Sequence, residues 1–207
     1  VGTGTNTETV LAEETADSST LGLQETQNMT ENETDKAALS SVKLNLDQDL
    51  EKVPAVFSDY VDKLSAYSVT LVYSDGSEKL LDGEDSNYSL TVSYEDSKDE
   101  EQNIHKICHA VVKEVSTGKE FEDTQEIILG RAAPDEISTE AMTTLILQGK
   151  KKWLIVQSTP SVSGSYALNS DRTINNIWYK SENGEIIAED ILKLQKDTTY
   201  QFLITLK

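Results

Sequence analysis

Short runs of β-forming residues, each bounded by a turn signal, are the feature that most constrains how this chain can fold. In the last of them, residues 199–206, aromatic and aliphatic side chains alternate with others from Tyr200 to Leu206. Successive side chains of a strand point to opposite faces, so this run predicts a strand with one face packed inward. Asn183-Gly184 lies between two further apolar runs, and this pair is the strongest short signal for a β-hairpin.

The same alternation predicts strands through the first half of the folded region. An edge strand is expected at Val42–Leu46, followed by strands at Tyr67–Tyr73, Tyr88–Tyr94, Ile107–Val115 and Glu120–Leu129. Another is expected at Thr143–Gly149. Between the first two strands, apolar residues recur at the spacing of one helical face, so we expect one short helix near residues 54–65 with Pro54 in its first turn. The fold class is therefore all-β, with two small antiparallel β-sandwich modules.

Composition separates a leading segment from these modules. Residues 1–41 are rich in Thr, Glu, Asn, Ser and Ala, and they contain eight acidic residues and one basic residue. Such a segment cannot bury enough apolar surface to offset the ~1–2 kcal/mol per residue that backbone ordering costs. We expect a flexible acidic linker at 1–41, one module at 42–130 and a second at 131–207, with the boundary at residues 131–134.

Three landmarks within residues 142–207 go beyond alternation. An aromatic strand ends in Thr159-Pro160, Ser163-Gly-Ser-Tyr166 follows, and a Leu-x-x-x-Thr-x-Tyr-x-Phe run spans Leu194–Phe202. This order resembles the bacterial pre-peptidase C-terminal domain. The resemblance implies a β-sandwich in a cell-surface protein of Gram-positive bacteria. The segment Asp171–Asn176 lacks the acidic turn of some members, so the resemblance carries no calcium role to this chain.

A second resemblance covers residues 66–130. The segment Tyr67–Ser77 is similar to the strand and Tyr-x-Asp-Gly-Ser turn of bacterial immunoglobulin-like domains, in which a tyrosine-containing strand follows. The Ser-Thr-Gly-Lys hairpin within Val115–Phe121 fits the same pattern. The resemblance implies an Ig-like β-sandwich at 42–130.

Charge and apolar content exclude several classes of partner. The net charge is −19, and residues 42–130 alone carry twenty acids and eight bases, whereas residues 131–207 carry nine of each. This acidity excludes a basic footprint for nucleic acid and disfavours an anionic membrane surface. No run approaches the ~18 apolar residues that span a bilayer, so we expect no membrane insertion. The acidity is typical of a soluble surface.

His105, Cys108 and His109 are the residues whose types could suggest zinc or thiol chemistry. Structural zinc sites usually bring two separated ligand pairs, and this chain has one cluster. Alternation places Cys108 on the face opposite the two histidines, so we expect a buried small thiol. No Gly-x-Ser-x-Gly elbow or other activated nucleophile is present. We therefore expect no catalytic residues and no enzyme, and a hydrolase is the least favoured class.

Two low-specificity binding sites remain. Trp178 and Tyr179 are adjacent and point to opposite faces of a strand, so one of them could be exposed and stack on a sugar. The other candidate is calcium, because two loops concentrate oxygen ligands and loops at one end of a sandwich could supply six to eight of them. Its residues are Asp82, Glu84, Asp85, Asp96 and Asp99. We expect no cofactor apart from this calcium.

These observations predict a non-catalytic module of an exported bacterial cell-surface protein, acting in adhesion, spacing or support of a neighbouring domain. The expected location is extracellular or at the cell surface, and the expected partners are cell-wall or host glycans or proteins. The alternative is a carbohydrate-binding module that uses exposed aromatic residues.

Overall fold

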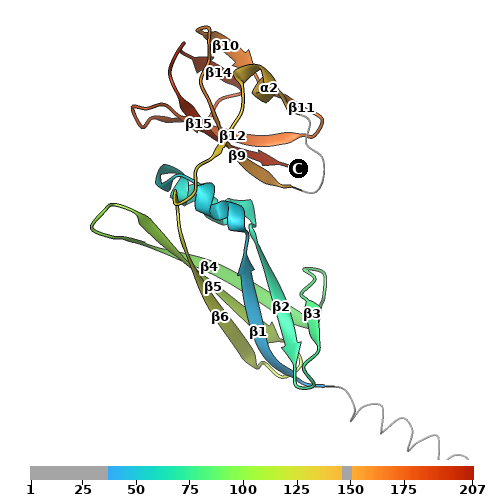
Figure 1. Cartoon of the computed structure of the whole chain (residues 1–207). Coiled ribbons are helices and arrows are strands. Elements are labelled where there is room, and N and C mark those ends of the chain that lie inside the picture. Colours follow the sequence, from blue (N-terminus) through green and yellow to red (C-terminus); the bar gives the residue numbers. More distant parts are fainter. Residues whose placement is uncertain (1–36, 146–150) are drawn as a thin grey trace, which may run out of the picture. The chain divides into compact units, whose positions relative to one another are not determined.

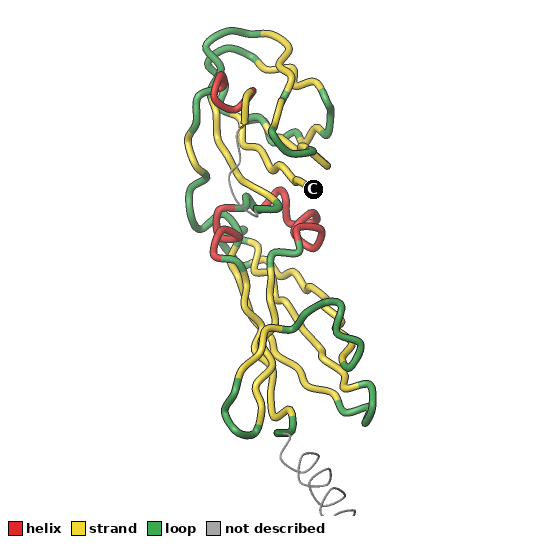
Figure 2. The backbone as a smooth tube through the Cα atoms, turned by 90° about the vertical axis from the view of Figure 1, so that its right-hand side faces the viewer, coloured by secondary structure: helices red, strands yellow, loops and turns green. Residues whose placement is uncertain are grey.

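The computed structural model describes residues 37–145 and 151–207, and strands dominate this part of the chain (Figures 1 and 2). The all-β prediction is confirmed. Among these described residues, 37–40 with 72–77 belong to one unit, and residues 41–71 with 78–145 and 151–207 belong to a second. The linker predicted at 1–41 lies almost entirely outside the described residues, as does most of the strand predicted at 143–149.

Six strands form two sheets, with orders β1-β2-β3 and β4-β5-β6. Their bounds are β1 (Leu39–Leu46), β2 (Tyr67–Tyr73), β3 (Glu78–Leu80), β4 (Tyr88–Lys98), β5 (Ile104–Glu114) and β6 (Glu120–Ile128). The strands predicted in this region are therefore present, most of them somewhat longer than expected. Strand β5 buries alternate residues from Ile104 to Val112, as a strand with one face on a core should.

A five-stranded sheet of order β13-β12-β15-β9-β7 organises the rest of the chain. The strands after residue 130 are β7 (Asp135–Glu136), β8 (Thr144–Leu145), β9 (Trp153–Ser158), β10 (Gly164–Ala167), β11 (Asn169–Ser170), β12 (Ile174–Lys180), β13 (Ile186–Ile187), β14 (Ile191–Leu194) and β15 (Tyr200–Leu206). The predicted hairpin is confirmed, since β12 pairs with β13 around Gly184, whose φ is +79°. Most strand pairs are antiparallel, whereas β7 pairs with β9 and β8 with β11 in parallel.

Strand β15 is buried on both faces. It pairs with β12 on one side and with β9 on the other. Phe202 belongs to one buried cluster and its neighbour Leu203 to another, and neither side chain is exposed. The prediction that one face of this run packs inward is confirmed, since Tyr200, Phe202, Ile204 and Leu206 are all buried. The second face is covered as well, which alternation in sequence cannot show.

Within residues 37–145 and 151–207, three short helices interrupt the strands: η1 (Gln48–Lys52), η2 (Ala55–Leu64) and α2 (Thr139–Thr143). The helix predicted near residues 54–65 is confirmed as the 3₁₀ helix η2, which Pro54 precedes and which ends at Ser65 with a φ of +50°. The Asp47 carboxylate accepts a hydrogen bond from the Asp49 amide and caps η1. Thr143, the first residue of the strand predicted at 143–149, is instead the last residue of helix α2. At the other end of this helix, the Ser138 hydroxyl caps it by accepting a hydrogen bond from the Ala141 amide at 3.1 Å.

One buried cluster contains residues from both predicted modules. Its members come from η1, η2 and the segments beside them (Leu50, Val53, Phe57, Val61, Leu64, Ala66), from β5, β6 and the residue after β6 (Ile104, Ile127, Leu129), and from the C-terminal sheet (Trp153, Ile155, Trp178, Leu203). We call it the joint core. The Tyr60 ring stacks on the Trp178 ring with centroids 4.5 Å apart. Helix η2 and β12 are thus packed directly together.

The segment predicted as the module boundary is attached to η1. The Ala132 amide donates to the Glu51 carbonyl at 2.9 Å, and Lys52 pairs with Asp135 at 2.8 Å. At Gly130 the backbone φ is +75°, a conformation that glycine adopts without strain. The boundary at residues 131–134 stays a prediction.

We expect Leu50→Ala to lower the free energy of unfolding by about 2–5 kcal/mol, because it leaves a cavity in the joint core. Leu50 is fully buried, so contact with solvent does not replace the contacts that its neighbours lose. Urea unfolding checks the value. The matched control is Leu80→Ala, at a position 62% exposed, which should change stability by less than about 0.5 kcal/mol. Equal effects of the two substitutions would contradict the placement of Leu50 in the joint core.

Candidate functional site

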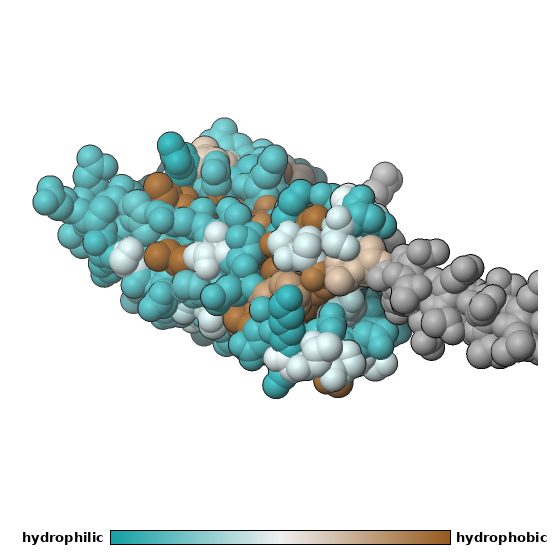
Figure 3. All heavy atoms as spheres, turned by 90° about the horizontal axis from the view of Figure 1, so that it is seen from below, coloured by the Kyte–Doolittle hydropathy of each residue, from teal (hydrophilic) through white to brown (hydrophobic). Residues whose placement is uncertain are grey.

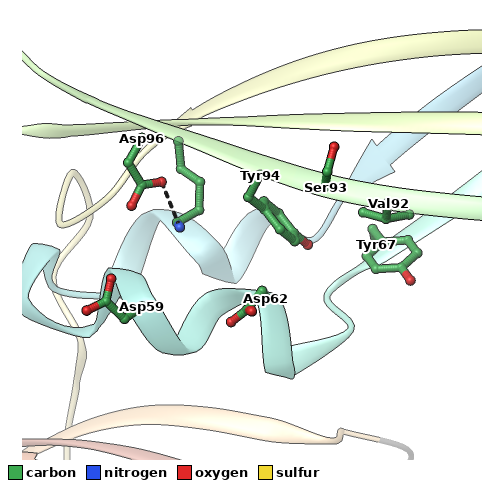
Figure 4. Close-up of a pocket in the computed structure, with 8 residues that line it drawn as sticks. Asp59, Asp62, Tyr67, Val92, Ser93, Tyr94 and Asp96 are labelled. Atoms are coloured by element: carbon green, nitrogen blue, oxygen red, sulfur yellow. Dashed lines mark ion pairs between the residues drawn. The ribbon is translucent and has the colours of Figure 1, made fainter.

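A cavity of about 420 Å³ lies between η2 and the sheet β4-β5-β6 (Figure 4). Four elements or their flanks contribute its lining: Asp59 and Asp62 from η2, Tyr67 from β2, Val92, Ser93, Tyr94 and Asp96 from β4, and Lys106 from β5. Because the chain reverses between these elements, residues almost fifty positions apart in sequence meet here.

Lys106 is the most deeply buried charged residue of the cavity, with 4% of its surface exposed. It lies directly opposite Asp96 in the β4–β5 register, and its Nζ is 2.7 Å from the Asp96 Oδ1. The same nitrogen lies 5.4 Å from the centroid of the Tyr94 ring, an arrangement that adds a cation–π attraction. A buried ammonium group is tolerated only when it is paired. The charges of Lys106 and Asp96 therefore neutralise each other.

Tyr94 extends from β4 into the cavity toward Tyr67 (Figure 4). Its hydroxyl oxygen is buried and has no hydrogen-bond partner among the described residues. The pKa of Tyr94 is raised, chiefly because burial disfavours the phenolate, and nearby Cys108 adds to the shift. The hydroxyl is thus neutral at physiological pH and has an unused hydrogen-bonding capacity beside the cavity.

Cys108 lies on β5 opposite Tyr94 and is completely buried. Burial raises the pKa of its thiol, while Tyr94 and Lys106 act in the opposite direction. The net effect keeps the thiol protonated, which makes it a poor nucleophile. The predicted buried small thiol is confirmed.

Asp59 and Asp62 carry the uncompensated charge of the site. Both side chains belong to exposed residues of η2, and within residues 37–145 and 151–207 neither makes an ion pair or a side-chain hydrogen bond. Three aspartates face one lysine across the cavity, so two negative charges remain. Such a site favours a cationic or hydrogen-bond-donating group, and the Tyr67 and Tyr94 rings offer it aromatic surface.

The sequence prediction missed this cavity, although signals for part of it existed. Asp59 and Asp62 are three residues apart on a predicted helix and therefore share a face. The sequence predicts Asp96 as a calcium ligand, whereas in the structure it pairs with Lys106. The approach of η2 to β4 depends on tertiary packing, so spacing along the chain could not show it.

The predicted sugar-binding aromatics are buried. Trp178 is 6% exposed and Tyr179 is 1% exposed, so the expectation that one of them faces solvent is wrong. Both faces of β12 are covered: Trp178 packs into the joint core against Tyr60, and Tyr179 stacks on Phe202 in the second cluster. Neither ring presents a free face, and the carbohydrate-binding alternative loses the observation that motivated it.

The predicted calcium ligands lie in two separate places. Asp82, Glu84 and Asp85 precede β4, whereas Asp96 and Asp99 lie at its other end, and β4 has 11 residues. At about 3.3 Å per residue the two groups are roughly 30 Å apart, so the expectation of loops at one end is wrong.

Most of these carboxylates are also engaged. Asp82 and Asp85 accept amide hydrogen bonds from residues two positions on, and Asp99 binds His105. In the part of the chain that the structure describes, no group of three or more His, Cys, Asp or Glu side chains is arranged to hold a metal ion. Calcium binding stays a prediction.

The two histidines of β5 each lie within hydrogen-bonding distance of carboxylates on the face of the sheet opposite Cys108. His105 lies between Glu126 and Asp99, with N–O distances of 2.6 and 2.9 Å, and His109 is 3.0 Å from Glu95. The pKa of His105 is raised, first by its hydrogen bond with Glu126 and then by that with Asp99. The His105 hydrogen bond is also the main reason that the pKa of Asp99 is lowered to about 2.

No family model matches the chain, and neither a curated protein nor a solved structure matches it. The resemblances to pre-peptidase C-terminal and immunoglobulin-like domains therefore stay predictions. None of the helices that the structure describes is both long enough and apolar enough to cross a membrane.

We expect Asp96→Ala to lower the free energy of unfolding by about 1–3 kcal/mol, because it leaves the buried Lys106 ammonium unpaired. Lys106→Met removes the charge while keeping the apolar stem, so the same Asp96→Ala change in that background should cost less than about 0.5 kcal/mol. Urea unfolding of the four proteins in this double-mutant cycle checks the coupling. Equal costs of Asp96→Ala in both backgrounds would contradict it.

The His105 pairs should make stability depend on pH. Because the pKa of His105 is raised above 6.5, its contribution is fully present below 6.5 and is lost as pH rises through the folded pKa. Because the pKa of Asp99 falls from 3.8 to about 2, its contribution is present above 3.8 and is lost as pH falls toward 2. The difference in the free energy of unfolding between wild type and His105→Gln should therefore be largest between pH 3.8 and pH 6.5. Thermal melts across this range measure it, and a difference independent of pH would refute the assignment.

Proposed function

We propose that this chain is a non-catalytic spacing and support module of an exported bacterial cell-surface protein. The observation that carries the proposal is the joint core, in which residues from both predicted modules are buried together. A spacer holds its neighbours apart only if its own parts do not bend at their connection. Adjacent domains are expected to move relative to each other unless a large apolar interface joins them.

Three kinds of contact support a stiff connection. Phe57, Val61 and Leu203 bury their side chains almost completely in the joint core, and burying such a side chain contributes about 1.5–3 kcal/mol. The Tyr60–Trp178 stack adds a directional contact. The Glu51 carbonyl accepts a hydrogen bond from the Ala132 amide and Lys52 donates one to Asp135, and these two bonds hold the connecting segment against η1. Bending at the connection would have to break all three.

Export and a surface location are supported by the sequence. The order of landmarks from Trp153 to Phe202 resembles that of the pre-peptidase C-terminal domain. The net charge of −19 is typical of a protein that must stay soluble without a partner covering it. The face shown in Figure 3 is mainly hydrophilic, with apolar residues in limited areas between the polar ones.

A distance measurement across the joint core tests the spacing role. Spin labels on cysteines at the exposed positions Thr117 and Val162, in a Cys108→Ser background, should give one narrow distance distribution. Tyr60→Ala removes the stack on Trp178 and should broaden the distribution, whereas Leu80→Ala, at an exposed position, should not. Circular dichroism verifies that each variant is folded. A broad distribution in the unsubstituted background would overturn the proposal.

A further inference from the structure

Strand β4 has an open edge. It is the terminal strand of the sheet β4-β5-β6 and pairs with β5 along its whole length, from Tyr88 to Lys98. No strand among the described residues pairs with its other edge. Along this edge, alternate residues of β4 direct their backbone N–H and C=O groups away from the sheet. A row of unpaired backbone groups is a template for an added strand.

The opposite edge of this sheet is less accessible. The Asp123 carboxylate of β6 accepts a hydrogen bond from the Leu44 amide of β1 at 2.7 Å. A side chain of β6 thus reaches β1 and obstructs the approach of another strand. Of the two edges, β4 is the one that can accept a partner.

The cavity described above reaches this open edge. Val92, Ser93 and Tyr94 are consecutive residues of β4, and all three line it. Val92 and Tyr94 share the face of β4 that lies toward the cavity, whereas the Ser93 side chain points to the opposite face (Figure 4). Because β4 is the terminal strand of its sheet, the cavity lies beside the open edge. A strand added to β4 would therefore bring its own side chains to the mouth of the cavity.

The chemistry of the cavity specifies a basic side chain. Lys106 is neutralised by Asp96, whereas Asp59 and Asp62 have no counter-ion among the described residues. The Tyr94 hydroxyl is buried without a hydrogen-bond partner, and its lone pairs can accept from an N–H donor. The rings of Tyr67 and Tyr94 provide faces for a cation. An acidic segment, including a second copy of this acidic chain, would be repelled.

We propose that the open edge of β4 binds an extended basic segment of a partner protein by strand addition, with a lysine or arginine side chain seated between Asp59, Asp62 and the two tyrosines. Backbone hydrogen bonds to β4 would supply affinity, and the cavity would supply selectivity for charge. This interaction surface goes beyond the spacing role and does not depend on the joint core.

The probe for this proposal is a peptide of about ten residues that alternates threonine and lysine, which matches the length of β4. Titration into ¹⁵N-labelled protein should shift the amide resonances of residues 88–98 in a saturable way. The same peptide with alternate backbone N-methylation keeps the charge but cannot pair along one edge, so its shifts should disappear from β4. A peptide with glutamate in place of lysine should not bind.

Protein variants separate local charge from overall charge. Asp59→Asn with Asp62→Asn should weaken binding about three- to tenfold, the scale of two partly exposed ion pairs. Glu189→Gln with Asp190→Asn removes the same charge from exposed positions far along the chain and should leave the Kd unchanged. No saturable shift up to about 5 mM peptide, equal binding of the N-methylated peptide, or equal loss in both double variants would overturn the proposal. None of these outcomes bears on the spacing role, which the spin-label distances test separately.

Discussion

The burial of one face of η2 is the interaction on which the rest of the structure depends. Phe57, Val61 and Leu64 follow the helical spacing and enter the joint core together. The opposite face leaves Asp59 and Asp62 exposed toward β4. The same ten-residue helix therefore connects the two groups of sheets and forms one wall of the acidic cavity. Loosening its packing would disturb both the connection and the site.

Much of the fold could be predicted from sequence because strand alternation and turn chemistry are local. The β2 strand and the Asn183-Gly184 hairpin matched expectation since their signals lie within a few residues. The inward face of β15 also matched expectation, but the covering of its second face depends on residues such as Trp153 and Trp178, which come from other strands. Helix α2 was not predicted, because its main local signal is the single serine cap at Ser138.

The candidate site was less predictable than the fold. Sequence favoured Trp178 and Tyr179 because adjacent aromatic residues on a strand suggest one exposed ring, but a strand inside a sheet covered on both faces exposes neither. It favoured the acidic loops because oxygen ligands cluster there, but the length of β4 separates them. Cys108 was predicted correctly, since alternation alone decides which face a strand residue takes. The cavity needed the approach of η2 to β4, which no local pattern encodes.

The position of β15 also sets an order in which the C-terminal sheet can be assembled. Strands β9 and β12 are both made before β15 during synthesis. The only antiparallel partner of β9 among the described residues is β15, and β12, which otherwise pairs over two residues with β13, has its long antiparallel pairing with the same strand. Until those residues emerge, Trp153, Trp178 and their neighbours have no strand between them to complete either buried cluster. The sheet closes in a late step that joins strands distant in sequence, and such non-local pairing is intrinsically slow. The five-stranded sheet lacks its middle strand until residues 200–206 have been made.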